Sequence, residues 1–482
     1  MMRISNLEPA KKSEPVGMAW LLSRHRRTAL WRTNCAATLD NFARHAAGGA
    51  ARTPVAQQLL TLCESDLALL LAGKGRARMV WDMLREGRDP VREAGAIVAG
   101  EIAGRDARPS ALEMMSSARQ SAGGERLGLT AKTARMLLDA GAALPLARVK
   151  QHVTAACGTH KLLIELEHGA QVETVLIPSQ EHSVSKRKRT TLCVSSQSGC
   201  ARGCIFCATG KLGLLRNLTA SEILAQVFLA TRLAREEGLP GVQNVVFMGE
   251  GEPLNNMRHV SKAVELMTSP GGFMLSPRKV TVSTVGPSPS HIRRIAALPA
   301  AVAWSLHAAD DDIRKRLVPT QRWHVHDLRD AFVDVLAQRG PGHHLFVEAT
   351  LLRGINDSLE DAEKMAKILE PFRAGIADAP KVNLLAYNDN GVSGLACSSD
   401  EVMRAFRDRL MREGYVCTLR RARGTPQSAA CGQLSGAARP ASARRKTVNV
   451  KGTHPVAAEE RSRRIPAFLT MSRASCLCDR HC

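Results

Sequence analysis

Three cysteines, Cys200, Cys204 and Cys207, stand close together in the run CARGCIFC, separated by three and then two residues. Thiolates at this spacing can wrap one corner of a cube-shaped [4Fe–4S] cluster, each binding one iron and leaving the fourth iron open to chelate a small molecule. A zinc site or chance would be the alternatives. Structural zinc takes four ligands, and no paired Cys-x-x-Cys follows. The spacing therefore favours an iron–sulfur centre.

A second candidate is the triplet Gly251-Glu252-Pro253, which follows an apolar run predicted to be a strand. Glycine lets another group approach the backbone closely, and a carboxylate can accept hydrogen bonds from an ammonium group. Such a triplet alone is commonly just a turn. Its place at a strand end, about 50 residues beyond the cysteines, favours a role in ligand binding.

The elements that must position these residues alternate between strands and helices from about residue 190 to 435. Short, mostly apolar runs predict strands, and amphipathic stretches at 221–237 and 359–369 predict helices between them. Thr219 and Glu222 form a capping-box pattern ahead of the first helix. Such alternation predicts parallel βα units, with the chemistry where strands end and loops begin. The predicted strands are 244–248, 279–283, 301–306, 345–351, 382–385 and 416–419.

Other segments of the chain differ in composition. Residues 1–55 are predicted to be a basic disordered arm or an organellar transit segment, and 436–482 a basic disordered tail. Helical spacing over Gln57–Leu71 and Ala77–Leu84 predicts a small helical domain at 56–150. Residues 151–189 are predicted to be a β-rich segment, with a hairpin turn at Glu167-His168-Gly169.

The charge balance points to a polyanionic partner. The 482 residues include 67 Lys and Arg against 45 Asp and Glu, a formal net charge of +22. RNA or DNA is the obvious partner class, and a merely solvated basic surface is the alternative. No apolar run reaches the roughly 18–20 residues of a membrane span. Thirteen cysteines without a secretory signal favour a reducing compartment. The expected location is the cytoplasm, with a plastid or mitochondrion as the alternative.

Taken in order, these motifs resemble one family, the radical S-adenosylmethionine (SAM) RNA methyltransferases of the RlmN/Cfr type. The resemblance spans about 60–435 and implies a partial (β/α)6 barrel of the radical SAM class. The matching stretches are VETVLIP from Val172, TLCVSSQSGCARGCIFCATG from Thr191, RNLT from Arg216, FMGEGEPLNN from Phe247, VTVSTVG from Val280, SLHAADDDIRKRLVP from Ser305, LLRGINDS from Leu351, KVNLLAYN from Lys381 and RRARGTPQSAACGQL from Arg420.

The resemblance also implies roles for single residues. Cys431 matches the cysteine that carries a transient methyl group, Cys193 the cysteine that resolves the covalent adduct, and Glu173 a proposed proton acceptor. Cys200, Cys204 and Cys207 match the cluster ligands. The positions expected to contact SAM are Gly251, Glu252, Ser283, Ser305, Leu306, His307 and Asn388.

The implied reaction methylates C2 of adenosine in rRNA, tRNA or both, with two SAM per turnover and a transient disulfide between Cys193 and Cys431. It implies a reductase or a ferredoxin- or flavodoxin-type electron donor, and we expect a monomer. Lys186 to Arg189 could contact RNA phosphates or form a solvated turn. Target carbon C8, another radical SAM substrate, and an RNA-binding protein that has lost catalysis are the alternatives.

The chain departs from the family pattern at three places. Glu250 stands where the family usually has methionine. The stretch before Cys431 is usually acidic and here reads Thr425-Pro426-Gln427-Ser428, and a common glutamine of the helical motif is replaced around Arg78-Met79. None of these changes removes a residue that the chemistry requires.

Overall fold

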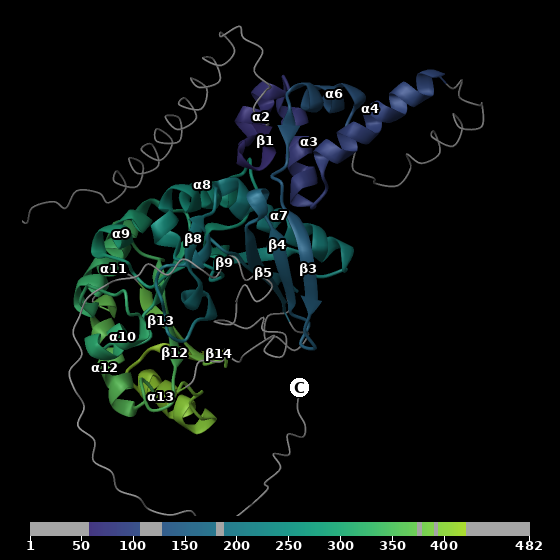
Figure 1. Cartoon of the computed structure of the whole chain (residues 1–482). Helices are drawn as coiled ribbons and strands as arrows, with labels where there is room; N and C mark the ends of the chain where they lie inside the picture. The colour runs from purple at the N-terminus through teal and green to yellow at the C-terminus, as the bar shows by residue number, and fades with distance from the viewer. Residues whose placement is uncertain (1–56, 107–127, 180–187, 374–377, 390–393, 421–482) are drawn as a thin grey trace, which may run out of the picture. The chain divides into compact units, whose positions relative to one another are not determined.

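The computed structural model describes residues 57–106, 128–179, 188–373, 378–389 and 394–420, except for the side chains of residues 57 and 102–106 (Figure 1). The predictions for 1–55 and 436–482 lie outside these ranges. Among the described helices, none combines the length and apolarity needed to cross a bilayer.

The N-terminal part is mostly helical. It comprises α2 (Glu64–Leu70), α3 (Lys74–Arg85), α4 (Pro90–Asp106) and α6 (Ala131–Asp139), with a short strand pair of β1 (Gln57–Gln58) and β2 (Ala142–Ala143). The prediction of a helix over Gln57–Leu71 was wrong in its first half, where β1 and a 3-10 turn stand. The Asp66 carboxylate accepts from the backbone N–H of Cys63 at 3.0 Å, and this capping box begins the helix at Glu64.

The rest of the fold is organised around one ten-stranded sheet. Its seven parallel strands are neighbours in chain order, which is the arrangement of a partial βα barrel. They are β6 (Thr190–Cys193), β9 (Val242–Phe247), β10 (Val280–Thr284), β11 (Ala301–Ser305), β12 (His344–Leu351), β13 (Asp378–Ala386) and β14 (Val416–Arg420). This confirms the predicted fold class and the six predicted strands, which are β9 to β14; β6 is a seventh parallel strand that was not predicted.

Three antiparallel strands continue the sheet beyond β6. They are β5 (Gln171–Pro178), β4 (His160–Glu165) and β3 (Arg148–Thr154), so the predicted β-rich segment extends the barrel sheet. The 3-10 turn Glu167–Gly169 joins β4 to β5, where a hairpin turn is predicted.

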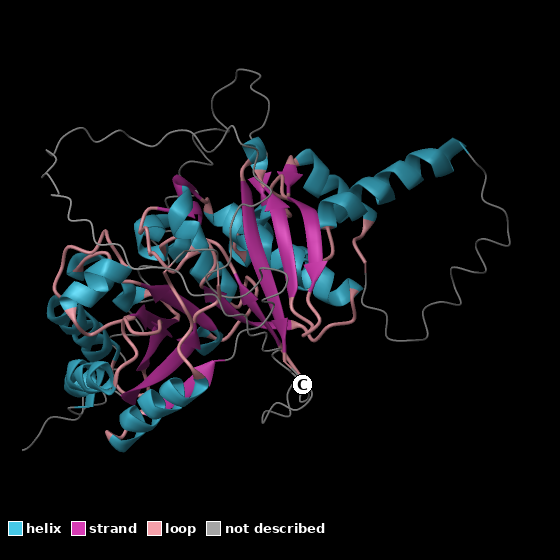
Figure 2. Cartoon of the chain, turned by 60° about the horizontal axis from the view of Figure 1, so that its bottom comes forward, coloured by secondary structure: helices cyan, strands magenta, loops and turns pink. Residues whose placement is uncertain are grey.

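The helices lie on the outer side of the barrel strands (Figure 2). They are α7 (Ala220–Glu236), α8 (Met257–Thr268), α9 (Pro289–Arg293), α10 (Asp311–Leu317), α11 (Val325–Arg339), α12 (Leu359–Leu369) and α13 (Asp400–Arg412). Helix α7 also contacts the N-terminal part, because Arg232 Nε donates to Gly87 O at 3.2 Å. The apolar faces of these helices and the outward face of the parallel strands form one core, whereas the inward face of several strands is polar and lines a cavity.

Candidate active site

The three cysteines lie on a hairpin inserted between β6 and β9. Its strands are β7 (Gln197–Cys200) and β8 (Gly213–Asn217), which the sequence did not predict. Cys200 ends β7, and the backbone N–H of Cys207 donates to Cys204 O at 3.1 Å, which closes the loop. Gly199 has φ +74°, and a Cβ there would lie 2.1 Å from Gly213 O. The hairpin therefore requires glycine directly before its first cysteine.

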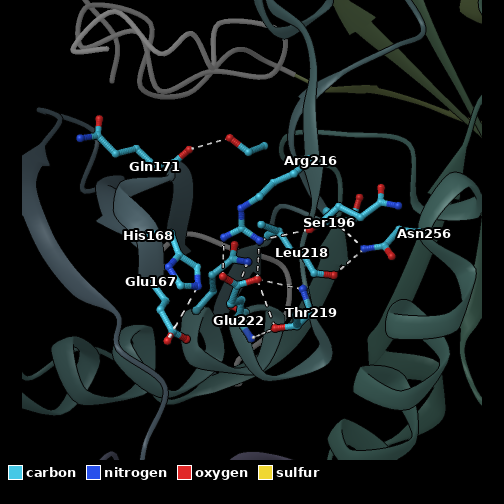
Figure 3. Close-up of polar contacts among 12 residues, drawn as sticks. Glu167, His168, Gln171, Ser196, Arg216, Leu218, Thr219, Glu222 and Asn256 are labelled. Carbon is cyan, nitrogen blue, oxygen red and sulfur yellow. Dashed lines mark hydrogen bonds and ion pairs between the residues drawn. The ribbon is translucent and has the colours of Figure 1, made fainter. Parts of the chain in front are cut away.

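An ion pair and several hydrogen bonds hold this hairpin against α7 (Figure 3). Arg216 of β8 donates to the Glu222 carboxylate at 2.9 Å, and the same carboxylate accepts from Thr219 N at 2.9 Å. This confirms the predicted capping box. Asn256 adds a second fixing point, because its amide donates to Ser196 O and Leu218 O at 2.8 and 2.7 Å.

The cysteine thiols are held in a dry site. Burial raises the pKa of Cys200 to about 12 and raises that of Cys204 well above its usual value, and the other two thiols add to the shift at Cys204. Such thiols become thiolates together only when cations replace their protons, as the irons of a cluster do. All three line one cavity and none forms a disulfide, so they fit a [4Fe–4S] cluster.

A single metal ion needs ligands that lie closer together than the ligands of a cluster do. Within the described ranges, no three His, Cys, Asp or Glu side chains are grouped closely enough to hold one ion. A cube-shaped cluster needs a wider arrangement, since each of its irons takes one thiolate.

The opposite wall of the cavity is built from strand ends. Glu252 follows β9 and is buried, and its carboxylate accepts from Thr284 Oγ1 at 2.6 Å, Leu254 N at 3.0 Å and Val285 N at 3.0 Å. Burial raises the pKa of Glu252, and these hydrogen bonds oppose the rise. Two carboxylate oxygens offer about four acceptor positions, so one remains for a ligand ammonium.

Two serines and a histidine continue this wall. Ser283 Oγ and Ser305 Oγ lie 3.1 Å apart at the ends of β10 and β11. His307 Nδ1 accepts from Thr350 N at 3.2 Å, so its Nε2 carries the proton. Burial, reinforced by the nearby Arg314 cation, lowers the pKa of His307 to about 3, and the ring is neutral at physiological pH.

The cavity thus brings together nine of the predicted residues. These are Cys200, Cys204, Cys207, Gly251, Glu252, Ser283, Ser305, His307 and Asn388. Leu306 does not line it, because its side chain is buried in the main core. It takes part only through its backbone, whose N–H donates to Glu348 O at 3.0 Å.

Several lining residues were not predicted. Thr284 stands in the VTVSTVG stretch, and its place directly after Ser283 could have indicated a role. Glu348 offered no such signal. Its carboxylate accepts from Asn383 Nδ2 at 2.8 Å and from Arg420 Nη1 at 3.2 Å. The rim of the cavity is therefore joined to the last residue of β14.

Cys193 and Glu173 lie outside this set but share a face of the sheet. Cys193 pairs with Val175 across β5 and β6, and Glu173 is two residues from Val175. Directly opposed residues, and residues two apart in one strand, point to the same side. Lys161 pairs with Val175 from β4, and its Nζ lies 3.5 Å from Glu173 Oε1. The two groups therefore form an ion pair on this face of the sheet.

Some predicted features fall elsewhere. Cys431, the stretch before it, Lys186 and Arg187 lie outside the described residues. Glu250 is buried, and its carboxylate accepts from Glu173 N at 3.1 Å and Gly199 N at 2.9 Å. The departure at this position therefore links β5 to the cysteine hairpin.

Comparison with known proteins points to the same family as the sequence motifs. The sequence model of the radical SAM superfamily matches residues 194–368. The dual-specificity RNA methyltransferase RlmN of Psychrobacter arcticus is 38% identical over 328 residues, which cover 65% of this chain and 78% of the relative. The protein of the same name from Francisella tularensis subsp. novicida is 39% identical over 283 residues, covering 58% and 73%. The crystal structure of a radical SAM methyltransferase from Sphaerobacter thermophilus has a TM-score of 0.61 at 31% identity, covering 78% of this chain and 99% of that one.

Proposed function

The chain belongs to the RlmN/Cfr-type family of radical SAM RNA methyltransferases, and from that membership we propose that it methylates C2 of an adenosine in rRNA or tRNA. The observation that carries the proposal is the cavity, where three thiols suited to a cluster face Glu252 and the ends of β10, β11 and β13. Cys200, Cys204 and Cys207 would hold the cluster, which when bound supplies the electron that cleaves SAM to methionine and a 5′-deoxyadenosyl radical.

Glu252 would receive the amino group of SAM, with Gly251, Ser283, Ser305, His307 and Asn388 around the rest of the molecule. His307 stays neutral and donates through Nε2, so it orients the ligand without adding positive charge. The backbone at Leu306 fixes the position of both neighbours.

The target carbon explains why a radical is needed. C2 of adenine is electron-poor and cannot displace the methyl group of SAM, whereas a thiolate can. Cys431 would take the methyl group from a first SAM, releasing S-adenosylhomocysteine. The 5′-deoxyadenosyl radical from a second SAM would remove one hydrogen from that methyl group, and the resulting methylene radical would add to C2.

The covalent RNA adduct must then be resolved. The radical adduct would give one electron back to the cluster, and Glu173, which is paired with Lys161, would accept the C2 proton. The Cys193 thiolate would then attack the Cys431 sulfur, the carbon–sulfur bond would break, and the released methylene carbon would take up a proton to give methyladenosine. A disulfide would remain that an external reductant must reduce. The shared sheet face of Cys193 and Glu173 supports this pairing.

RNA is proposed as the partner on charge and family grounds. The net charge of +22 suits a polyanion. A stacked adenine cannot reach a cavity lined by strand ends, so the target must be unpaired or flipped out. Aromatic residues make up only 4% of the chain, which favours recognition of a folded RNA by shape and phosphate contacts.

The proposal is tested by reconstituting the protein anaerobically with iron and sulfide and supplying SAM, reductant and total RNA. Mass spectrometry of digested RNA should detect 2-methyladenosine, absent with Cys431→Ala and retained with Cys157→Ala on the β3–β4 turn. An 8-methyladenosine signal would move the target atom to C8. SAM cleavage without any methyladenosine would refute RNA methylation and point to another substrate.

A further inference from the structure

One buried cation lies behind the cysteine loop. Arg314 of α10 is 0% exposed, and its guanidinium donates to Val285 O at 2.5 Å, Ser305 O at 3.2 Å and Leu306 O. These carbonyls stand at the ends of β10 and β11, beside the serines of the cavity wall. Arg314 therefore braces two neighbouring strand ends.

Three carbonyl dipoles do not neutralise this charge. Among the described residues, no carboxylate lies within ion-pair distance of Arg314, although the Asp311 carboxylate acts on it from farther away, and its buried Nε has no hydrogen-bond partner. A buried charge without a directly paired counter-ion is costly, because water is absent. Arg314 would therefore be stabilised by an anion bound close to it.

The cysteine loop is the neighbour that would hold the anion. Helix α10 and the turn after it are fixed to the loop by two hydrogen bonds, from Ile205 N to Leu317 O at 3.0 Å and from Thr320 Oγ1 to Arg202 O at 2.9 Å. Leu317 and Cys204 pack in one small apolar cluster. Arg314 and the Cys204 sulfur interact electrostatically through this dry region, where charges are weakly screened.

We propose that Arg314 is a positioning residue and the built-in counter-charge of the iron–sulfur cluster, raising its reduction potential. Three thiolates leave the oxidised cluster with a net negative charge, and reduction adds one more. A fixed cation nearby stabilises the reduced form more than the oxidised form, so the electron enters more easily. The inference rests on the cluster of the proposed function but needs neither RNA nor methyl transfer.

The test separates the charge of Arg314 from its bracing contacts. The midpoint potential of the reconstituted cluster is measured by redox titration followed by electron paramagnetic resonance, without RNA. Arg314→Gln removes the charge and should shift the potential to more negative values. Arg316→Gln, on the same helix but exposed, is the matched control and should leave it unchanged. An unshifted potential in a fully loaded Arg314→Gln protein would overturn the proposal.

Arg314→Lys keeps the test valid if the glutamine variant does not fold. Its amine retains the charge but cannot span three carbonyls, and a buried amine loses its proton more readily than a guanidinium. The potential of this variant should match that of the wild type at low pH and fall below it as pH rises. Glu252, whose pKa burial raises, and the charged groups Arg202 and Asp311 are present in both proteins, and His307 is neutral in both, so the difference between the two profiles isolates residue 314. Identical profiles in both proteins would refute the charge effect.

A loaded cluster with the expected shifts, but no methylated RNA, would leave this inference intact and refute the proposed function. Methylated RNA with identical potentials in all variants would support the proposed function and refute this inference.

Discussion

Replacing Gly199 by alanine should disable the cysteine hairpin more than backbone strain alone can explain. Gly199 and Gly158 have nearly the same positive φ, +74° and +75°. An alanine at either site adopts a left-handed conformation, at a cost of roughly 1–2 kcal/mol. At Gly158, in the β3–β4 turn, the added Cβ meets no atom within 4 Å, so that variant isolates the strain.

At Gly199 the Cβ would lie 2.1 Å from the carbonyl oxygen of Gly213, which belongs to the backbone and cannot rotate away. The pairing of Gly199 with Leu214 and of Cys200 with Gly213 must then open. Each lost ladder bond costs about 0.5–1.5 kcal/mol. The two variants share the strain, so Gly199→Ala should be less stable by a further ~1–3 kcal/mol.

Anaerobic urea unfolding of the apoprotein measures the free energies of unfolding, and iron and sulfide analysis measures cluster content. Gly158→Ala should load iron as the wild type does, and Gly199→Ala should load much less because Cys200 is displaced. Equal losses of stability with full iron in both variants would show that the contact with Gly213 does not constrain the hairpin.

Three further predictions concern the cavity and the sheet face beside it. Glu252→Gln should weaken SAM binding by about tenfold or more, since a charged hydrogen bond contributes roughly 1.5–3 kcal/mol; anaerobic calorimetry measures this, and an unchanged affinity would exclude the ammonium contact. Cys193→Ala should accumulate a covalent protein–RNA adduct, which denaturing gels detect, and in Lys161→Met the same adduct should persist longer than in the wild type. Turnover without an adduct in Cys193→Ala would contradict the resolving role of Cys193. His307 binds a proton more weakly in the folded protein, with a pKa of about 3 against roughly 6.5 unfolded. The contribution of this neutral imidazole to the free energy of unfolding is complete above pH 6.5 and is lost as pH falls, by about 2 kcal/mol at pH 5. Urea unfolding at several pH values measures this loss, and His307→Gln should remove it.

The strands could be predicted because the face that packs against the helices is apolar, so that each strand stands out as a short, mostly apolar run. Their carboxyl ends meet at one edge of the sheet, so the grouping of Glu252, Ser283, Ser305 and Asn388 follows from topology. Leu306 shows the limit of this reasoning, because a motif match does not reveal which neighbour faces the cavity and which faces the core.

Other features depend on information that one sequence does not carry. The contact of Lys161 with Glu173 requires the register between β4 and β5, and a slip of one residue would put the two side chains on opposite faces. The hairpin β7–β8 is short and lacks a clear alternating pattern, so its strands were missed. Arg314 stands in a motif of charged residues, and nothing in that pattern separates the buried guanidinium from its exposed neighbours.

The contact of β14 with the cavity rim also limits how far Cys431 can lie from the cavity. Arg420 ends β14 in contact with Glu348, and Cys431 follows eleven residues later along the chain. Eleven residues can span at most about 40 Å, so the Cys431 sulfur lies within about that distance of Arg420. Under the proposed function, the transfer of a methyl group from bound SAM to Cys431 would therefore be intramolecular, and its rate should not depend on the concentration of the enzyme.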